Sequence, residues 1–365
     1  MSGPVLNKAW LSSFGLGRVF KDNVSCTDGQ CLQTQSINSL DFYENGEFLI
    51  TASDDESLHL YNCESGTYVS KTVFSKRYGV DLVRFTHHPQ AVLVASKNGW
   101  DESIRYLSLY DHKFLRYFKG HKQKRVVSLE LHPTNDTFLS AALDNTVRLW
   151  DLRSNNCQGL IRVTGRPAVA YDPQGLIFAV ACGPDSVKLF DDRNCDKGPF
   201  STTKINSVKG AGSSDWTFVK ISPDGKYILL ATTTSTLYLL DAFDGTLLRT
   251  FSQFSNKVKG VIEAGFSPDS AYVLSGESFR PCVSRCRAVW ASVRPYLHSS
   301  LCDRSLGSDD GAIHVWETES GNSVCTYAGH SSSVSVVQFN PTKMLVASGD
   351  TAGNVALWVP PASGS

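Results

Sequence analysis

The residues of this sequence that could do chemistry begin with a set of polar and aromatic side chains that recurs in the chain. Its members are His121, Ser140, Asp144, Trp150, His330 and Trp358. His121 and Asp144 could act as a catalytic base and the carboxylate that orients it. Alternatively, His121 bridges Asp144 and the hydroxyl of Ser140 inside the fold, and Trp150 donates its N–H to a buried acceptor. Because the second half of the chain reuses two parts of the set at a similar spacing, and an active site is not usually duplicated, we interpret it as a structural staple.

A second candidate is a metal site. Cys282, Cys286, His298 and Cys302 could hold Zn²⁺ tetrahedrally, although their spacing is loose. They lie in segment 277–307, which contains five arginines and no lysine. We interpret this segment as a disordered loop, or as sequence outside the mature chain, and expect no metal and no cofactor. The adjacent histidines at 87 and 88 would point to opposite faces of a strand, which disfavours a metal site there as well.

A third candidate is a basic surface for partner binding. Its residues are Lys76, Arg77, Lys124, Arg125 and Arg166, which precede apolar strand-like runs. If they meet at one rim of the fold, they could bind a phosphorylated or acidic peptide, because arginine makes bidentate contacts with such groups. The alternative is a solvated edge that binds nothing.

Charge and motifs exclude several classes of function. Lysine plus arginine and aspartate plus glutamate both number 35, so net charge gives no argument for general nucleic-acid or membrane binding. The sequence contains no glycine-rich phosphate loop, no nucleophile elbow and no carboxylate pair at a common pocket, so we expect no enzyme. No signal peptide or membrane span is visible, and the ten cysteines, none in a CxxC motif, are interpreted as reduced.

A repeated strand–turn–strand unit must position all of these residues. In 120–151 an apolar alternation, a turn at 132–135, a second apolar run and a turn at 144–145 precede a last strand. The turn residue and the end of the third strand are 17 apart in five repeats, at 44 and 61, 133 and 150, 173 and 190, 223 and 240, and 341 and 358. The separation is 18 between 89 and 107 and 48 between 268 and 316. These seven anchors predict seven repeats, and the excess of 31 residues (48 − 17) predicts an insertion at 277–307.

Units of this kind stack to bury their faces, so we predict an all-β, seven-bladed β-propeller. The last repeat is followed by Pro360 and Pro361, which cannot continue the interior of a sheet. That repeat lacks a fourth strand, and the strand-like run at 17–20 has no neighbour, so the N-terminal strand is predicted to close the ring. The expected organisation is a flexible N terminus at 1–16, a propeller at 17–359 with the insertion in blade six, and a tail at 360–365.

The Gly120-His121 opening and the Trp150-Asp151 close of this unit resemble the WD-repeat family, over residues 36–359. Five strings resemble more narrowly the small WD-repeat subunit of COMPASS-type histone H3 lysine-4 methyltransferase complexes. They are YGVDL at 78–82, SIRYLS at 103–108, RYFKGH at 116–121, RLWDLR at 148–153 and DKGPF at 196–200. The strings GRPAVAYD at 165–172 and VKLFD at 187–191 lean toward the plant form.

This resemblance implies a non-catalytic nuclear scaffold that helps a methyltransferase reach transcribed chromatin. It also implies contact with the phosphorylated tail of RNA polymerase II, a part in a nuclear phosphatase and transcription-termination assembly, and no sequence-specific contact with nucleic acid. The insertion at 277–307 and the long polar connection at 24–35 depart from the family pattern. The alternative is an unrelated WD-repeat adaptor that brings substrates to a cullin-type ubiquitin ligase.

We predict that residues 277–307 are dispensable for the fold. Deleting them should leave the protein folded and equally or more stable, because a loop between two strands breaks no ladder hydrogen bond and each doubling of its length costs only about 0.6 kcal/mol. Thermal unfolding of both proteins checks this, and limited proteolysis should cut the full chain first near the arginines of the segment. Stoichiometric zinc in the full chain, absent from the deletion variant, would contradict the loop interpretation.

Overall fold

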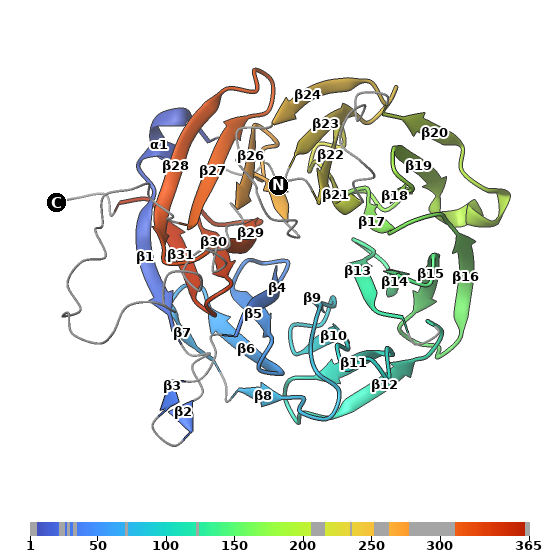
Figure 1. Ribbon diagram of the computed structural model, residues 1–365, viewed down its shortest axis with the longest axis horizontal. Helices are drawn as coiled ribbons and strands as arrows, with labels where there is room; N and C mark the ends of the chain where they lie inside the picture. The colour runs from blue at the N-terminus through green and yellow to red at the C-terminus, as the bar shows by residue number, and fades with distance from the viewer. Residues whose placement is uncertain are drawn as a thin grey trace, which may run out of the picture.

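The chain forms a ring of seven antiparallel sheets, which confirms the predicted all-β, seven-bladed β-propeller (Figure 1). The computed structural model describes residues 6–21, 26–27, 30–31, 35–69, 72–121, 124–205, 216–233, 236–251, 263–276 and 311–361. In the described part of the chain, no helix is long and apolar enough to cross a membrane.

The first four blades follow the order of the chain. Blade one contains β4 (Ile37–Phe42), β5 (Phe48–Ser53), β6 (Ser57–Asn62), β7 (Thr67–Tyr68) and β8 (Val73–Phe74). Blade two contains β9 (Val83–Phe85), β10 (Ala91–Ala95), β11 (Ile104–Ser108) and β12 (Phe114–Phe118). Blade three contains β13 (Val126–Leu131), β14 (Thr137–Ala142), β15 (Thr146–Asp151) and β16 (Cys157–Arg162). Blade four contains β17 (Ala168–Tyr171), β18 (Ile177–Cys182), β19 (Ser186–Asp191), the 3₁₀ helix η1 (Asp192–Lys197) and β20 (Ser201–Lys204).

The remaining blades include the closing one. Blade five contains β21 (Trp216–Ile221), β22 (Tyr227–Thr232), β23 (Leu237–Asp241) and β24 (Leu247–Phe251). Blade six contains β25 (Ala264–Phe266), β26 (Tyr272–Gly276), β27 (Gly311–Glu317) and β28 (Ser323–His330). Blade seven contains β29 (Val334–Phe339), β30 (Val346–Asp350), β31 (Val355–Val359) and β1 (Gly15–Phe20). A separate hairpin, β2 (Cys26–Thr27) with β3 (Gln30–Cys31), lies outside the ring.

The core lies between blades. Second strands are buried on both faces, and every residue of β10 and of β30 is buried, because each sheet is packed between two neighbouring sheets. Ile50 of blade one and Val92 of blade two, for example, belong to one hydrophobic cluster. The first strands line the axis, so a polar residue on their inward face does not disturb this packing.

The ring is closed by β1, which pairs antiparallel with β31 and confirms the predicted closure. The partners run from Gly15 with Val359 to Phe20 with Val355, and a register shift lies between Leu16 and Arg18. The last blade thus obtains its fourth strand from the opposite end of the chain. Without this pairing, β31 would be an open edge.

The N-terminal segment is more ordered than the sequence suggested, and the expectation of a flexible 1–16 was wrong for residues 6–14. Helix α1 (Lys8–Ser12) begins after Asn7, whose Oδ1 accepts a hydrogen bond from the amide of Trp10 at 2.8 Å. Leu11 and Phe14 are buried in a cluster shared by blades six and seven. The hydroxyl of Tyr327 donates to the carbonyl of Leu11 at 3.0 Å. Helix α1 therefore joins these two blades, which a five-residue sequence pattern could not reveal.

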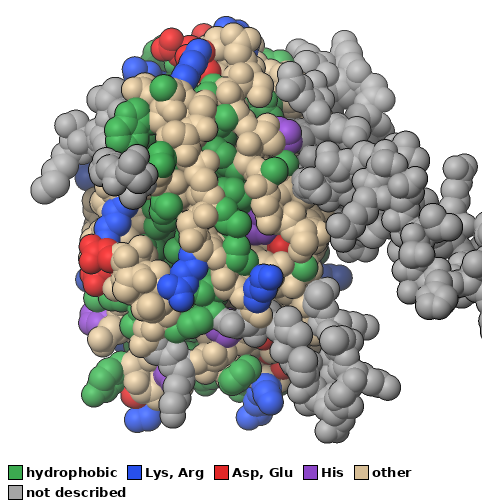
Figure 2. Space-filling model, turned by 90° about the vertical axis from the view of Figure 1, so that its left-hand side faces the viewer, with side chains coloured by type: hydrophobic (Ala, Val, Ile, Leu, Met, Phe, Trp, Pro, Cys, Tyr) green, Lys and Arg blue, Asp and Glu red, His purple; other side chains and the backbone are tan. Residues whose placement is uncertain are grey.

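The outer side of blades six and seven keeps some apolar surface. Figure 2 shows this side, where hydrophobic side chains lie among basic ones and polar backbone. Trp10 is 49% exposed and Leu16 is 44% exposed, although their neighbours Leu11 and Phe14 are buried. The N-terminal segment at 10–16 thus packs one side against the ring and exposes the other side to solvent.

The ring has two faces of different construction. Turns between first and second strands lie on one face, called the turn face here, at 43–47, 86–90, 132–136, 172–176, 222–226, 267–271 and 340–345. Connections between successive blades lie on the opposite face, called the connection face. On the turn face, Asn340 Nδ2 donates to the carbonyl of Gly46 at 2.8 Å, which ties blade seven to blade one. Gly46 has φ +69°, and a side chain there would collide with Asn340 and Thr342.

The outer strand of blade one is divided into β7 and β8, which both pair with β6. The insertion at 277–307 lies outside the described residues, as does most of the 360–365 tail. Its flanks, β26 and β27, pair as the second and third strands of blade six, in agreement with the repeat spacing.

We predict that Phe14→Ala lowers the free energy of unfolding by about 3–5 kcal/mol, because it removes a buried aromatic ring at the junction of blades six and seven. Trp10→Ala, on the exposed face of helix α1, should change it by no more than about 0.5 kcal/mol. Urea unfolding of both variants and the wild type measures the difference. Equal stability of the Phe14 variant and the wild type would show that the segment does not hold the ring.

Candidate interaction site

The histidine of blade three lies between a serine and an aspartate. His121 Nε2 is 2.7 Å from Ser140 Oγ, and Nδ1 is 3.1 Å from Asp144 Oδ2. The indole N–H of Trp150 donates to the same Ser140 oxygen at 2.8 Å. Burial lowers the pKa of His121 despite the nearby Asp144. Since the imidazole side chain is only 2% exposed, a substrate has no access to it, and the geometry favours a structural role.

Blade seven repeats this arrangement. His330 contacts Ser348 Oγ at 2.6 Å and Asp350 Oδ2 at 3.0 Å, and Trp358 donates to Ser348 at 2.8 Å. The sequence reasoning named His330 and Trp358 but missed Ser348 and Asp350. In blade seven the serine and the aspartate follow the histidine by 18 and 20 residues. In blade three the corresponding separations are 19 and 23 residues. A search that allowed a shorter turn between the second and third strands would have found them.

The predicted basic residues all lie on the connection face, ahead of the first strands of blades two, three and four. Lys76 and Arg77 lie between β8 and β9, Lys124 lies between β12 and β13, and all three are exposed. Among the described residues, none of these three forms an ion pair. Arg166 is half-buried in the connection between β16 and β17. The structure thus brings the set to neighbouring blades of one face.

Arg125 differs from the other members of the basic set because it has an internal partner. Its Nη2 donates to Asp81 Oδ1 at 2.7 Å, and its Nε donates to Asp81 Oδ2. The hydrogen bonds from Arg125 to Asp81 raise the pKa of the arginine, and the Asp81 side chain is only 2% exposed. This pair connects blades two and three, so Arg125 contributes less free charge to the surface than the sequence suggested.

Aromatic rings position the two basic residues of blade two. The Lys76 ammonium lies 5.6 Å from the centre of the Phe74 ring, and the Arg77 guanidinium lies 5.3 Å from that of Tyr78. Tyr78 also covers the buried Arg105 at 3.5 Å. The sequence reasoning missed Arg105, whose signal is a charged residue at an otherwise apolar strand position. These contacts hold Lys76 and Arg77 at the surface without neutralising them.

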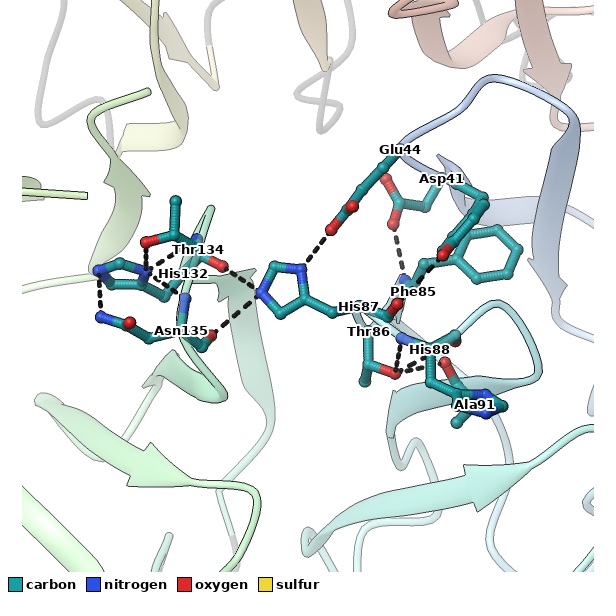
Figure 3. A network of polar contacts seen from close by, with 11 residues as sticks. Asp41, Glu44, Phe85, Thr86, His87, His88, Ala91, His132, Thr134 and Asn135 are labelled. Carbon is teal, nitrogen blue, oxygen red and sulfur yellow. Dashed lines mark hydrogen bonds and ion pairs between the residues drawn. The ribbon is translucent and has the colours of Figure 1, made fainter. Parts of the chain in front are cut away.

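A second polar network lies on the turn face, where His87 of blade two contacts blades one and three (Figure 3). Its Nδ1 contacts the carboxylate of Glu44, and its Nε2 lies 3.1 Å from both the carbonyl of His132 and that of Asn135. Carbonyl and carboxylate oxygens only accept, so all of these contacts are satisfied when both ring nitrogens carry protons, and they favour the cationic form of the imidazole. Burial lowers the pKa of His87, but the hydrogen bond and charge of Glu44 outweigh it and raise the pKa overall.

The suggested metal ligands Cys282, Cys286, His298 and Cys302 lie outside the described residues. Within the described ranges, no group of three or more His, Cys, Asp or Glu side chains could hold a metal ion. The cysteines at 63, 157, 182, 195 and 325 are free thiols.

The blades and their staples define a WD-repeat propeller. Residues 24–62, 112–151 and 321–358 match the family described as WD domain, G-beta repeat. The chain is 45% identical over 350 residues to WD repeat-containing protein 82 of Drosophila melanogaster, which covers 95% of each chain. It therefore belongs to the family of this protein.

Two further relatives extend this comparison. The chain is 39% identical to anthesis promoting factor 1 of Arabidopsis thaliana, over 89% of this chain and 87% of the relative. It is 36% identical to the Set1 complex component swd2 of Schizosaccharomyces pombe, over 84% of this chain and 88% of the relative. That relative is named as a component of a complex, in agreement with the expected non-catalytic WD-repeat subunit.

We predict that His87 stabilises the protein in a pH-dependent manner. The pKa of His87 is higher in the folded protein than in the unfolded chain, where it is about 6.5. The free energy of folding gained from the protonated imidazole is therefore fully present below about pH 6.5 and is lost as the pH rises through the pKa of the folded state. The melting temperature of His87→Gln should therefore fall further below that of the wild type at pH 6 than at pH 9. His88→Gln, at the exposed neighbouring histidine, serves as the control. An offset for His87→Gln that does not change with pH would contradict the cationic assignment.

Proposed function

We propose that this chain is a scaffold subunit of a nuclear Set1-type histone H3 lysine-4 methyltransferase complex. The observation that supports it most is the 36% identity to a Set1 complex component over most of both chains. A propeller built from seven packed sheets offers several independent surfaces and suits a subunit that joins partners. The polar sets of the staples are buried, so they support no catalytic role.

A finer part of the proposal concerns the connection face. Lys76, Arg77 and Lys124 are exposed and form no ion pair among the described residues, while the Asp81–Arg125 pair fixes the connections on which they stand. Cations held in this way favour an anionic ligand, because their charge is not already neutralised by the protein. We propose that this surface binds a phosphorylated peptide, namely the phosphorylated tail of RNA polymerase II, and that the scaffold also serves a nuclear phosphatase complex.

Purification of the tagged chain from nuclei, followed by mass spectrometry, tests membership of the complex. We expect subunits of a Set1-type methyltransferase in amounts comparable to the bait, together with methyltransferase activity on histone H3. Recovery of cullin-linked adaptors without methyltransferase subunits would replace this proposal with the ubiquitin-ligase alternative.

We predict that Lys76→Glu combined with Lys124→Glu weakens binding of phosphorylated polymerase-tail peptides by at least about tenfold, since each charged contact contributes roughly 1–3 kcal/mol when desolvated. Fluorescence anisotropy of labelled peptides at several salt concentrations measures the affinity. Arg125 is left unchanged because Arg125→Glu would set a carboxylate against the buried Asp81 and disturb the fold.

The matched control reverses two charges on the other face. Arg193 and Lys197 are both exposed, lie in η1 on the turn-face side of blade four, and form no ion pair among the described residues. Arg193→Glu combined with Lys197→Glu makes the same change in net charge and should leave the affinity close to that of the wild type. Equal loss in both double variants would mean that only net charge matters, and would exclude a specific surface.

A further inference from the structure

The axis of the ring contains a cavity of about 260 Å³, and Glu44, His87 and His132 of the turn face are among the residues that line it. Four of its charged residues occupy the same position in their blades. They are opposite the second-strand residues Ile50, Leu93, Leu139 and Leu229, and all four charged residues line the cavity. A fifth comes from the residue before β25. The five are Asp41, Arg84, Glu130, Lys220 and Glu263.

Part of this charge is matched within the protein. Arg84 Nε lies 3.6 Å from Glu130 Oε2, and its Nη1 donates to Ser39 Oγ at 3.1 Å and to the carbonyl of Val83 at 2.9 Å. At the mouth of the cavity, the His87 cation is matched by Glu44. The charges of Arg84 and Glu130 therefore balance, as do those of His87 and Glu44. Neither pair favours binding of a further charged ligand.

The remaining charges do not balance. The carboxylate of Asp41 accepts one hydrogen bond, from the amide of Phe85 at 2.8 Å. Neither the carboxylate of Glu263 nor the ammonium of Lys220 forms a hydrogen bond or an ion pair with any residue that the structure describes. Among the residues that the structure describes, the cavity thus holds two carboxylates and one ammonium without an ionic partner, which leaves this set one positive charge short.

The environment of the two carboxylates agrees with this deficit. Burial raises the pKa of Asp41 and of Glu263, and the positive charge of Arg84 opposes the rise in both without cancelling it. A carboxylate in this condition gains from a cation that enters the cavity. A further anion would meet two unmatched carboxylates and only one unmatched ammonium, so charge disfavours it.

We propose that this cavity receives the cationic end of a lysine or arginine side chain from a partner peptide that lies on the turn face. A bare metal ion fits less well, because the described residues contain no cluster of metal-ligating side chains. A long side chain can carry its charge from the turn face to the interior, and Gln338, which also lines the cavity, adds a carbonyl acceptor. The site lies on the face opposite the basic surface, so it does not depend on the proposed function.

The test uses the full chain and capped pentapeptides Ac-GGXGG-amide in which X is lysine, arginine, glutamine or glutamate. Binding is measured by NMR titration, which detects weak complexes. We expect the lysine and arginine peptides to bind and the glutamine and glutamate peptides not to bind. Glu263→Gln and Asp41→Asn keep the shape of the side chains and should each weaken binding about tenfold, as expected for loss of a charged contact.

Lys220→Gln provides a control of opposite sign. It removes the one unmatched cation, so it should strengthen binding of the lysine peptide, whereas general damage to the fold would weaken it. Melting temperatures of all variants establish that they are folded.

Three outcomes would overturn the proposal. Unchanged binding in Glu263→Gln and Asp41→Asn would place the peptide elsewhere. Binding of the glutamate peptide that is lost in Lys220→Gln would make the cavity an anion site. Binding of n-butylamine as tightly as the lysine peptide would assign the cavity to a free amine and remove the peptide partner.

Discussion

The structure depends on closure of the ring by strands from opposite ends of the chain. Each blade is covered by a neighbour on both faces, so the hydrophobic clusters are shared between blades and none belongs to one blade alone. The last blade has three strands from the C-terminal repeat, and β1 supplies the fourth. Helix α1 and the residues that follow it strengthen the same junction, because Leu11 and Phe14 pack where blades six and seven meet. An open ring would expose a strand edge and two apolar sheet faces together.

Closure also determines the chemistry of the two faces. On the turn face, contacts pass from blade to blade, from Asn340 to Gly46 and from Glu44 through His87 to the carbonyls of blade three. On the connection face, ion pairs such as Asp81 with Arg125 fix the loops, and unpaired lysines remain exposed. The first strands meet only at the axis, so the charges of the cavity come together only when the ring is complete.

Much of the fold could be predicted because it depends on local repetition. The 17-residue spacing located seven repeats, and the missing fourth strand predicted the role of β1. Within the candidate sites, the sequence predicted that His121 lies between Ser140 and Asp144, and the structure places its two ring nitrogens against these side chains.

The rest depends on contacts between distant residues. Leu11 meets Tyr327, and Asp81 meets Arg125, although neither pair has a local signal. The repeat spacing could have shown that Asp41 and Lys220 occupy the same position in the first strands of their blades. Which charges remain unmatched depends on distances across the ring, and these follow from its closure.

Hydrogen–deuterium exchange of the free full-length protein tests closure most directly. If β1 is an integral strand of blade seven, its amides should exchange as slowly as those of β31, to which it is hydrogen-bonded, and both should open together with the ring. Fast exchange in β1, at the rate of an unprotected segment, with β14 and the other inner strands still protected, would contradict a ring closed by the N terminus.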